Sequence, residues 1–175
     1  MRIGRVVTNS QNLASYSGST VMSSSFLDLH KAESQNFLLD GNKFVSLKSL
    51  IGFTEYRVYC TKPYHGRTNH AKFTNTNANS LPLFNYATQA SSSAPSSLCN
   101  ALVYMTGDNS RTKSLPCSSL RPSPVSINTR LYNFIWYVNA QTHLTVWSNS
   151  RMDCDDYSSS SPGYNNYGTW LFYVK

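Results

Sequence analysis

The segment Tyr64–His70 concentrates side chains that could bind a polar ligand. Its candidate ligand-binding residues are His65, Arg67, Asn69 and His70. Imidazole, guanidinium and amide groups supply hydrogen-bond donors and acceptors, and loops that carry them often form binding sites. The alternative is an ordinary turn at Gly66 whose side chains only hold the loop together. A zinc site is not expected, because the spacing of the two histidines fits no helical ligand pattern.

Three carboxylates, Asp153, Asp155 and Asp156, crowd together towards the C-terminal end. Carboxylate oxygens are ligands that Ca²⁺ prefers, so this cluster is a candidate calcium site, although the EF-hand spacing is absent. The alternative is that these acids pair with the basic middle of the chain or brace the turn beside Cys154. A glycosidase arrangement is poorly supported, because no second carboxylate site opposes them.

Tyrosine and asparagine gather just after these acids. The candidate ligand-binding residues here are Tyr157, Tyr164, Asn165 and Tyr167. Flat rings beside short polar groups suit the recognition of sugars or proteins. The alternative is an ordered loop whose tyrosines pack against the edge of a sheet.

Catalytic and nucleotide-binding motifs are absent from the sequence. No G-x-S-x-G, P-loop, G-x-G-x-x-G or H-E-x-x-H pattern occurs. A Cys/His nucleophile pair would need a free thiol, which paired cysteines exclude. We therefore expect no enzymatic activity, and no cofactor beyond the calcium considered above.

The four cysteines are Cys60, Cys99, Cys117 and Cys154. None forms a C-x-x-C pair, and an even count in a polar, tyrosine-rich chain favours disulfides in an oxidising compartment. Sequence leaves three connectivities open, of which we expect Cys99–Cys117 and Cys60–Cys154. The alternative is four buried thiols in a cytosolic protein. Residues 1–10 lack the apolar core of a signal peptide, so the chain is either a mature form with an added Met or not secreted. The cysteines favour the mature, secreted form.

The net charge of +7, from 15 Lys and Arg against 8 Asp and Glu, is localised. Between Arg57 and Arg130 lie eight basic residues and one acid, Asp108, which accounts for the whole excess. Such a region can bind an anionic partner or can simply be a solvated face. Nucleic acid is not expected, because no Lys/Arg-rich cluster, zinc-finger spacing or RNA-binding signature occurs. If Cys60 and Cys154 are joined, part of this charge is paired internally.

β-strand patterns dominate the sequence after residue 43. Residues 53–60 alternate, with Thr54, Tyr56, Val58 and Cys60 on the expected inner face. We expect strands at 44–51, 53–60, 102–105 and 168–174, and a hairpin of 131–138 with 142–147. Loops are expected at 74–98, 114–126 and 158–166. The one expected helix is 26–39, capped by Ser25 and followed by Gly41.

These elements indicate a single domain of all-β or β-rich class, a disulfide-bonded sandwich or irregular barrel with long loops. Residues 44–175 form the four-cysteine domain, and residues 1–43 form a partly irregular N-terminal segment packed on it. No apolar run approaches the roughly 20 residues of a membrane helix, so no membrane span is expected.

Several short motifs occur in a recognisable order. They are Tyr59-Cys60 with Lys62–His70, Cys99 and Cys117 around Gly107–Ser110, Arg130–Asn133, Cys154–Tyr157 and Gly168–Lys175. Together they resemble an uncharacterised secreted four-cysteine domain of coral and sea-anemone extracellular proteins, over about residues 53–175. The resemblance implies secretion and a role in a matrix, adhesion or defence. It brings no catalytic residues with it.

The function expected from the sequence is that of a secreted extracellular binding module, lectin-like, for a carbohydrate or matrix polymer. One alternative is a structural matrix protein without a discrete ligand. Another is a carrier of a hydrophobic small molecule or pigment among the many aromatic residues. Assembly into a homo-oligomer stays open.

Overall fold

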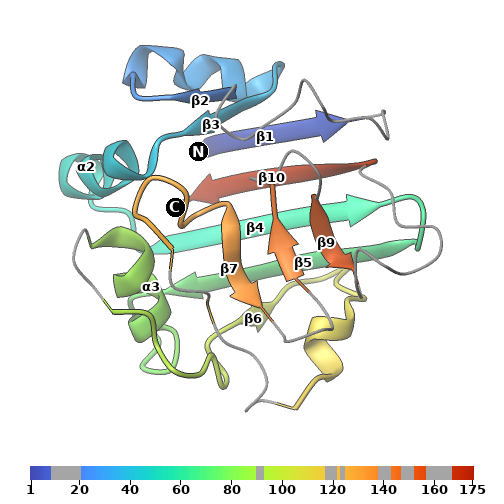
Figure 1. The fold of residues 1–175 in the computed structure, drawn as a ribbon. Helices are drawn as coiled ribbons and strands as arrows, with labels where there is room; N and C mark the ends of the chain where they lie inside the picture. Colours follow the sequence, from blue (N-terminus) through green and yellow to red (C-terminus); the bar gives the residue numbers. More distant parts are fainter. Residues whose placement is uncertain are drawn as a thin grey trace.

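An open seven-stranded mixed sheet organises the molecule (Figure 1). The computed structural model describes residues 1–8, 21–89, 93–116, 122, 125–137, 143–146, 152–156 and 167–175. In spatial order the strands are β2 (Met22–Ser23), β3 (Phe37–Leu39), β1 (Arg2–Thr8), β10 (Gly168–Val174), β4 (Glu55–Lys62), β5 (Arg67–Thr74) and β6 (Val103–Tyr104). All neighbours are antiparallel except β2 and β3. The predicted β-rich class is confirmed, and the sheet does not close into a barrel.

A second, three-stranded sheet and two α-helices cover one face of this main sheet (Figure 1). The second sheet consists of β7 (Asn133–Tyr137), β8 (His143–Thr145) and β9 (Asp153–Asp156). The helices are α2 (Gly41–Ile51) and α3 (Leu81–Thr88), and two 3₁₀ helices, η1 (Phe26–Glu33) and η2 (Arg111–Ser114), lie at the margins. β7 and β8 pair antiparallel, which confirms the predicted hairpin; its connection lies outside the described residues.

Aromatic side chains fill the space between these layers. On β4 the expected inner face is confirmed for Tyr56, Val58 and Cys60, which are fully buried. It is wrong before the strand begins at Glu55, because Thr54 is exposed and Phe53 is buried. The Tyr56 ring contacts the rings of Phe44 from α2 and Phe73 from β5. Such rings bury large areas and gain further from edge-to-face contacts. The aromatic composition therefore serves the core of the fold in large part.

Helix α2 replaces the strand predicted at 44–51, and that prediction is wrong. The Asp40 carboxylate accepts hydrogen bonds from the backbone N–H groups of Asn42 and Lys43, and Gly52 ends the helix with a left-handed φ of 64°. Both are standard helix boundaries. Gly41 consequently begins this helix, instead of following an earlier one.

Two further predictions, one of a helix and one of a loop, need correction. The predicted helix 26–39 is the 3₁₀ helix η1 followed by β3, although Ser25 caps it as expected, its side chain accepting from Leu27 N–H. Helix α3 lies within the predicted loop 74–98 and has proline in its first turn, where the missing N–H costs nothing. The low-complexity composition around it concealed this short helix.

Both ends of the chain lie in the middle of the main sheet. β1 pairs with β10, and the N-terminal ammonium donates to the Val174 carbonyl over 2.8 Å. The first residues are thus part of the sheet itself, while residues 9–20 lie outside the described part. Among the helices described, none has the length and apolar character needed to cross a membrane.

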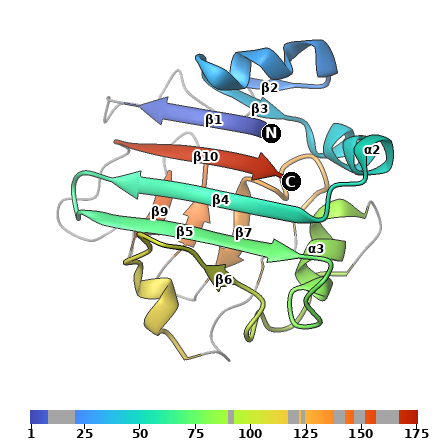
Figure 2. The same cartoon turned by 180° about the vertical axis from the view of Figure 1, so that it is seen from behind.

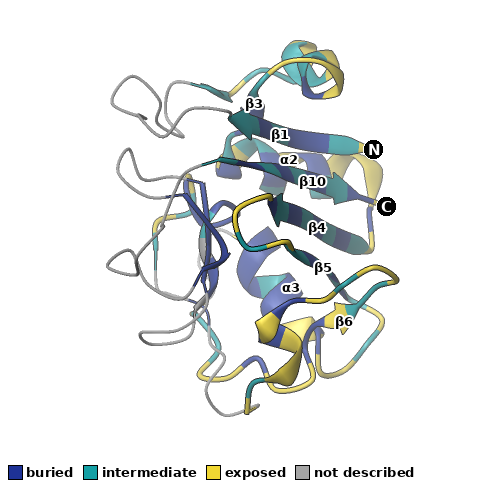
Figure 3. Ribbon diagram, turned by 90° about the vertical axis from the view of Figure 1, so that its right-hand side faces the viewer, coloured by how far each residue is buried: buried dark blue, intermediate teal, exposed yellow. Residues whose placement is uncertain are grey.

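The two faces of the main sheet differ in their surroundings. One packs against the helices and the second sheet, as the edge-on view shows (Figure 3). Over the other face of β10, β4 and β5, no helix or strand lies among the described residues (Figure 2). Side chains on this second face are half-buried by their own neighbours and can meet a partner.

Candidate functional site

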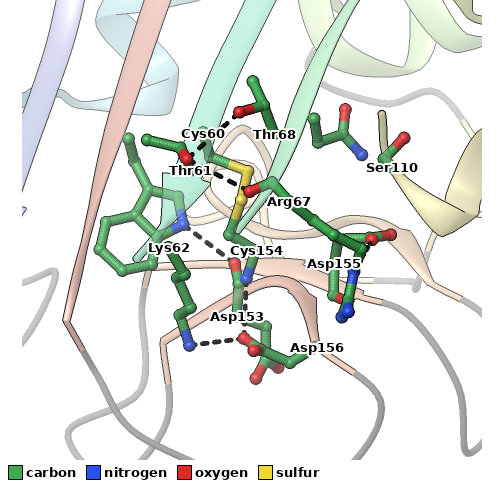
Figure 4. Close-up of a disulfide and its surroundings, with 12 residues drawn as sticks. Cys60, Thr61, Lys62, Arg67, Thr68, Ser110, Asp153, Cys154, Asp155 and Asp156 are labelled. Atoms are coloured by element: carbon green, nitrogen blue, oxygen red, sulfur yellow. Dashed lines mark hydrogen bonds and ion pairs between the residues drawn. A yellow bond between two sulfur atoms is a disulfide. The ribbon is translucent and has the colours of Figure 1, made fainter. Parts of the chain in front are cut away.

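A disulfide between Cys60 and Cys154 joins β4 of the main sheet to β9 of the second sheet (Figure 4). The two Cα atoms are 5.8 Å apart, an ordinary distance for such a bond. The expected pairing of these residues is confirmed. Cys99 is also disulfide-bonded, while its expected partner Cys117 lies outside the described residues.

A set of charged and polar side chains, here called the buried charge cluster, lies beside the disulfide. Its members are Lys62, His65, Arg67, Asp155 and Asp156. Lys62 Nζ lies 2.5 Å from Asp156 Oδ2, and His65 Nε2 lies 3.3 Å from Asp156 Oδ1. Burial alone would raise the pKa of Asp156, but hydrogen bonds from His65 and Lys62, the Lys62 charge and a backbone N–H outweigh burial and lower the pKa.

Asp155 forms the second centre of the cluster. Its carboxylate accepts from Arg67 Nε at 2.6 Å, from Arg111 N at 2.8 Å and from Thr112 N and Oγ1 at 3.1 and 3.0 Å. Its φ of 59° is a left-handed conformation that aspartate tolerates better than most residues. Because four donors converge on it, this buried carboxylate is fully satisfied.

The acids therefore pair with the basic middle of the chain, one of the two roles left open by the sequence. No group of three or more histidine, cysteine or acidic side chains that could hold a metal ion is found within the described ranges. Asp153 is buried as well, and its carbonyl accepts from Trp170 Nε1 at 2.9 Å. The calcium hypothesis gains no geometric support from these contacts.

The predicted ligand-binding residues of 65–70 point in different directions. They do not share one loop, because β5 already begins at Arg67. Asn69 is fully buried and donates to Thr112 Oγ1 at 3.2 Å, whereas His70 is half-buried on the uncovered face. Tyr167 is half-buried immediately before β10. The other three, Tyr157, Tyr164 and Asn165, lie outside the described residues.

A second candidate site lies on the uncovered face of the main sheet, here called the open sheet face. It consists of outward side chains aligned across β1, β10, β4 and β5: Arg2, Tyr173, Arg57 and Lys72 in one row, and Arg5, Leu171, Tyr59 and His70 in the next. The rows follow from strand register, since aligned residues on adjacent strands share a face.

Cation–aromatic contacts organise the first of these rows. The guanidinium of Arg57 lies 4.1 Å from the centre of the Tyr173 ring, and that of Arg2 lies 5.5 Å from it. In the second row the rings of Tyr59 and His70 meet edge to face at 5.4 Å. Arginine stacked on an aromatic ring keeps its in-plane N–H donors available for an anion.

Carboxylates balance only part of the charge on the open sheet face. Arg2 pairs with Glu33 at 3.2 Å, and Lys72 pairs with Glu55 at 2.6 Å. Among the described residues no carboxylate lies within 4.0 Å of Arg5 or Arg57.

Arg57 also stands directly opposite Lys72 in the register of β4 and β5. Like charges placed directly opposite each other on paired strands repel. This face is thus electrostatically incomplete in the free protein.

The sequence predicted part of this second site. The alternation of 53–60 assigns Arg57 and Tyr59 to the outer face of their strand. The contributions of Arg5 and Tyr173 come from the two ends of the chain, and only strand order brings them alongside. No motif marks that order in advance.

A small cavity of about 220 Å³ lies between β6 and η2. Its lining includes Leu98, Tyr104, Lys113 and Leu115. Burial raises the pKa of Tyr104, with Asp108 and Asp155 adding to the rise. The volume is below the roughly 300 Å³ at which pockets for drug-sized ligands begin. The cavity gives little support to a carrier of a large pigment.

The two candidate sites differ in what they leave for a ligand. The buried charge cluster has its charges paired inside the protein, whereas Arg5 and Arg57 on the open sheet face have no carboxylate partner in the part of the chain that the structure describes. No protein-family model, curated protein or solved structure matches this chain.

Proposed function

We propose that the chain is a secreted extracellular binding module that recognises an acidic carbohydrate or matrix polymer, sulfated or rich in uronic acid, on the open sheet face. The observation that carries this proposal is the Arg57 guanidinium stacked on Tyr173, with no carboxylate partner among the described residues. An anion there would complete the hydrogen bonds of the guanidinium fork, which matches sulfate and carboxylate geometry.

The shape of the face suits an extended polymer. Four adjacent strands spaced by about 4.8 Å make a surface roughly 14 Å across, wide enough for an extended polymer. Arg5 on β1 and Arg57 on β4 are two strands apart, so their Cα atoms are separated by roughly 10 Å across the strands. Two cations at this spacing can contact successive acidic groups of one chain.

Aromatic rings beside the cations are the second feature of this face that suits a glycan. Tyr59 and His70 offer ring edges and polar tips beside the cations. Binding of an anion would also relieve the repulsion between Arg57 and Lys72. Charge, aromatic surface and the relief of an unfavourable pair therefore favour the same kind of ligand.

The disulfide favours a glycan over a nucleic acid. Disulfides persist mainly in oxidising compartments, where the abundant acidic polymers are polysaccharides. Secretion also fits the resemblance to secreted four-cysteine domains. Basic and aromatic residues on a sheet can bind single-stranded nucleic acid as well, so nucleic acid belongs in the test as a competing outcome.

A binding comparison at physiological salt tests this proposal. The full chain with its disulfides intact is exposed to heparin, to chemically desulfated heparin, to a neutral glucan and to single-stranded RNA. We expect binding to heparin that weakens as salt is raised, with at least about tenfold weaker binding to the desulfated polymer. Equal binding to the desulfated polymer, no glycan binding, or a preference for RNA would each overturn it.

A further inference from the structure

Lys62 occupies a setting that is rare for a lysine. Its side chain is fully buried at the end of β4, with Nζ 5.9 Å from the centre of the Trp170 ring. Its stem fits beside Gly168, where an added Cβ would lie 3.0 Å from Lys62 Cγ and 2.9 Å from Trp170 Cη2. Lysines are almost never fully buried unless paired. Removal from water favours the neutral, nucleophilic amine, whereas the paired Asp156 carboxylate favours the ammonium.

The partner of Lys62 lies at the short end of hydrogen-bonding distance. Nζ lies 2.5 Å from Asp156 Oδ2. A charge-assisted hydrogen bond is about 2.7–2.9 Å long, and the nitrogen and oxygen of one amide group are about 2.2 Å apart from its bond lengths. The disulfide from Cys60 to Cys154, two positions earlier on each strand, fixes both backbones. Such fixed proximity replaces a large part of a reaction barrier.

We propose that Lys62 and Asp156 condense into an intramolecular amide bond, which cross-links β4 to β9 beside the disulfide (Figure 4). From the ion pair, Nζ passes one proton to the carboxylate and then attacks Cγ. A C–N bond forms, one C–O bond breaks, and a second proton moves from Nζ to the departing oxygen. An ammonium and a carboxylate thus become one neutral amide and one water, and no co-reactant is needed.

Two hydrogen-bond donors are aimed at the carboxyl group that would react. Cys154 N–H donates to Asp156 Oδ2 at 2.9 Å, and His65 Nε2 lies 3.0 Å from the Cys154 carbonyl oxygen and 3.3 Å from Asp156 Oδ1. His65 Nδ1 accepts from Arg67 N–H at 3.0 Å, so the hydrogen-bond network assigns the ring proton to Nε2. Donors placed at both oxygens stabilise the charge that develops during the attack, as in an oxyanion hole.

The Lys72–Glu55 pair provides an internal control. Its Nζ–Oε2 distance is 2.6 Å, close to that of the buried pair, but its side chains are 29% and 16% exposed on the open sheet face. Water hydrates both charges there. The two pairs therefore have similar distances but differ in burial. We expect only the buried pair to condense.

Peptide mass spectrometry tests the proposal on the folded full chain. After complete reduction, alkylation and tryptic digestion, we expect the peptides 58–67 and 152–175 to remain joined, with a mass about 18 Da below their sum because one water is lost. Cleavage after Lys72 should be normal, because that side chain stays unmodified. In the Lys62→Arg variant the peptides should separate, since arginine keeps the charge but does not form this amide.

Recovery of the two wild-type peptides separately, at unmodified masses, would overturn the amide bond. A joined pair that persists in Lys62→Arg would overturn it too, because the link would then involve other atoms. If that variant does not fold, the wild-type digest decides the question alone. The outcome is independent of glycan binding, since the two experiments share no reagent and no surface.

Discussion

The buried charge cluster and the open sheet face use the same kinds of side chain for opposite purposes. β4 and β5 supply cations to both regions: Lys62 and Arg67 point inward, whereas Arg57 and Lys72 point outward. Inside, the cations meet acids from β9 at 2.5 and 2.6 Å. Outside, Arg57 lies on a tyrosine ring and meets no described carboxylate.

This difference shows that a net positive charge does not by itself indicate a binding surface. Strand residues alternate between the two faces of a sheet, so the position of a cation in its strand decides whether it is structural or available. The net charge of +7 mixes both kinds. Arg130 is another structural cation, because it is buried and donates to the carbonyl groups of Tyr86 and Gln89 at 2.7 and 3.0 Å.

The largest effect is expected from removing the disulfide in a chain that cannot form the amide. In the Lys62→Met background, replacing Cys60 and Cys154 by alanine should lower the free energy of unfolding by about 4–5 kcal/mol, because a long loop opens. In the presence of Lys62 the cost should be less than about 2 kcal/mol, since the amide closes nearly the same loop. Urea unfolding measures both values.

Equal costs in the two backgrounds would show that Lys62 and Asp156 form only an ion pair. Such a result would not affect the contrast between the two regions, because an ion pair also neutralises both charges inside the protein. A small cost in both backgrounds would instead argue against a structural role for this junction of β4 and β9.

A matched pair of substitutions compares the two regions directly. Asp155→Asn removes a fully buried carboxylate that pairs with the partly buried Arg67 and should lower the free energy of unfolding by about 3 kcal/mol. Glu55→Gln makes the same chemical change beside the half-exposed Lys72 and should cost less than about 1 kcal/mol. Chemical denaturation of both variants checks the difference. Similar costs would contradict the distinction between structural and available charges.

The smallest effect on stability is expected on the open sheet face. Arg57→Gln removes the stack on Tyr173 but also the repulsion from Lys72, so the free energy of unfolding should change by no more than about 0.5 kcal/mol. Thermal unfolding at two salt concentrations measures it. A large loss would mean that this arginine is part of the structure, and the proposed binding role would lose its basis.

Strand alternation and one cysteine pairing are the features that the sequence predicted. Alternation assigned Tyr56, Val58 and Cys60 to the inner face, and the expected disulfide from Cys60 to Cys154 placed the acids beside the basic stretch. Helices α2 and α3 were missed, because the apolar residues of 44–51 fit a strand and the composition of 74–98 fits a loop. The caps at Asp40 and Gly52 were the signals that could have corrected the first.

The open sheet face depends on contacts between distant parts of the chain. β1 and β10 lie at opposite ends of the sequence and pair in the middle of the sheet. Their register sets Arg5 beside Leu171 and Arg2 beside Tyr173. Strand order of this kind is decided by long-range packing, so composition and periodicity could indicate single outward residues but not the surface they form together.

A charge-matched comparison of heparin affinity tests the central claim most directly. The variant Arg5→Gln/Arg57→Gln removes two charges from the open sheet face, and Lys43→Gln/Lys48→Gln removes two from α2 on the opposite side. The account predicts at least about a tenfold rise in Kd for the first variant, equivalent to about 1.4 kcal/mol, and less than about a twofold rise for the second. Equal losses of affinity would contradict it.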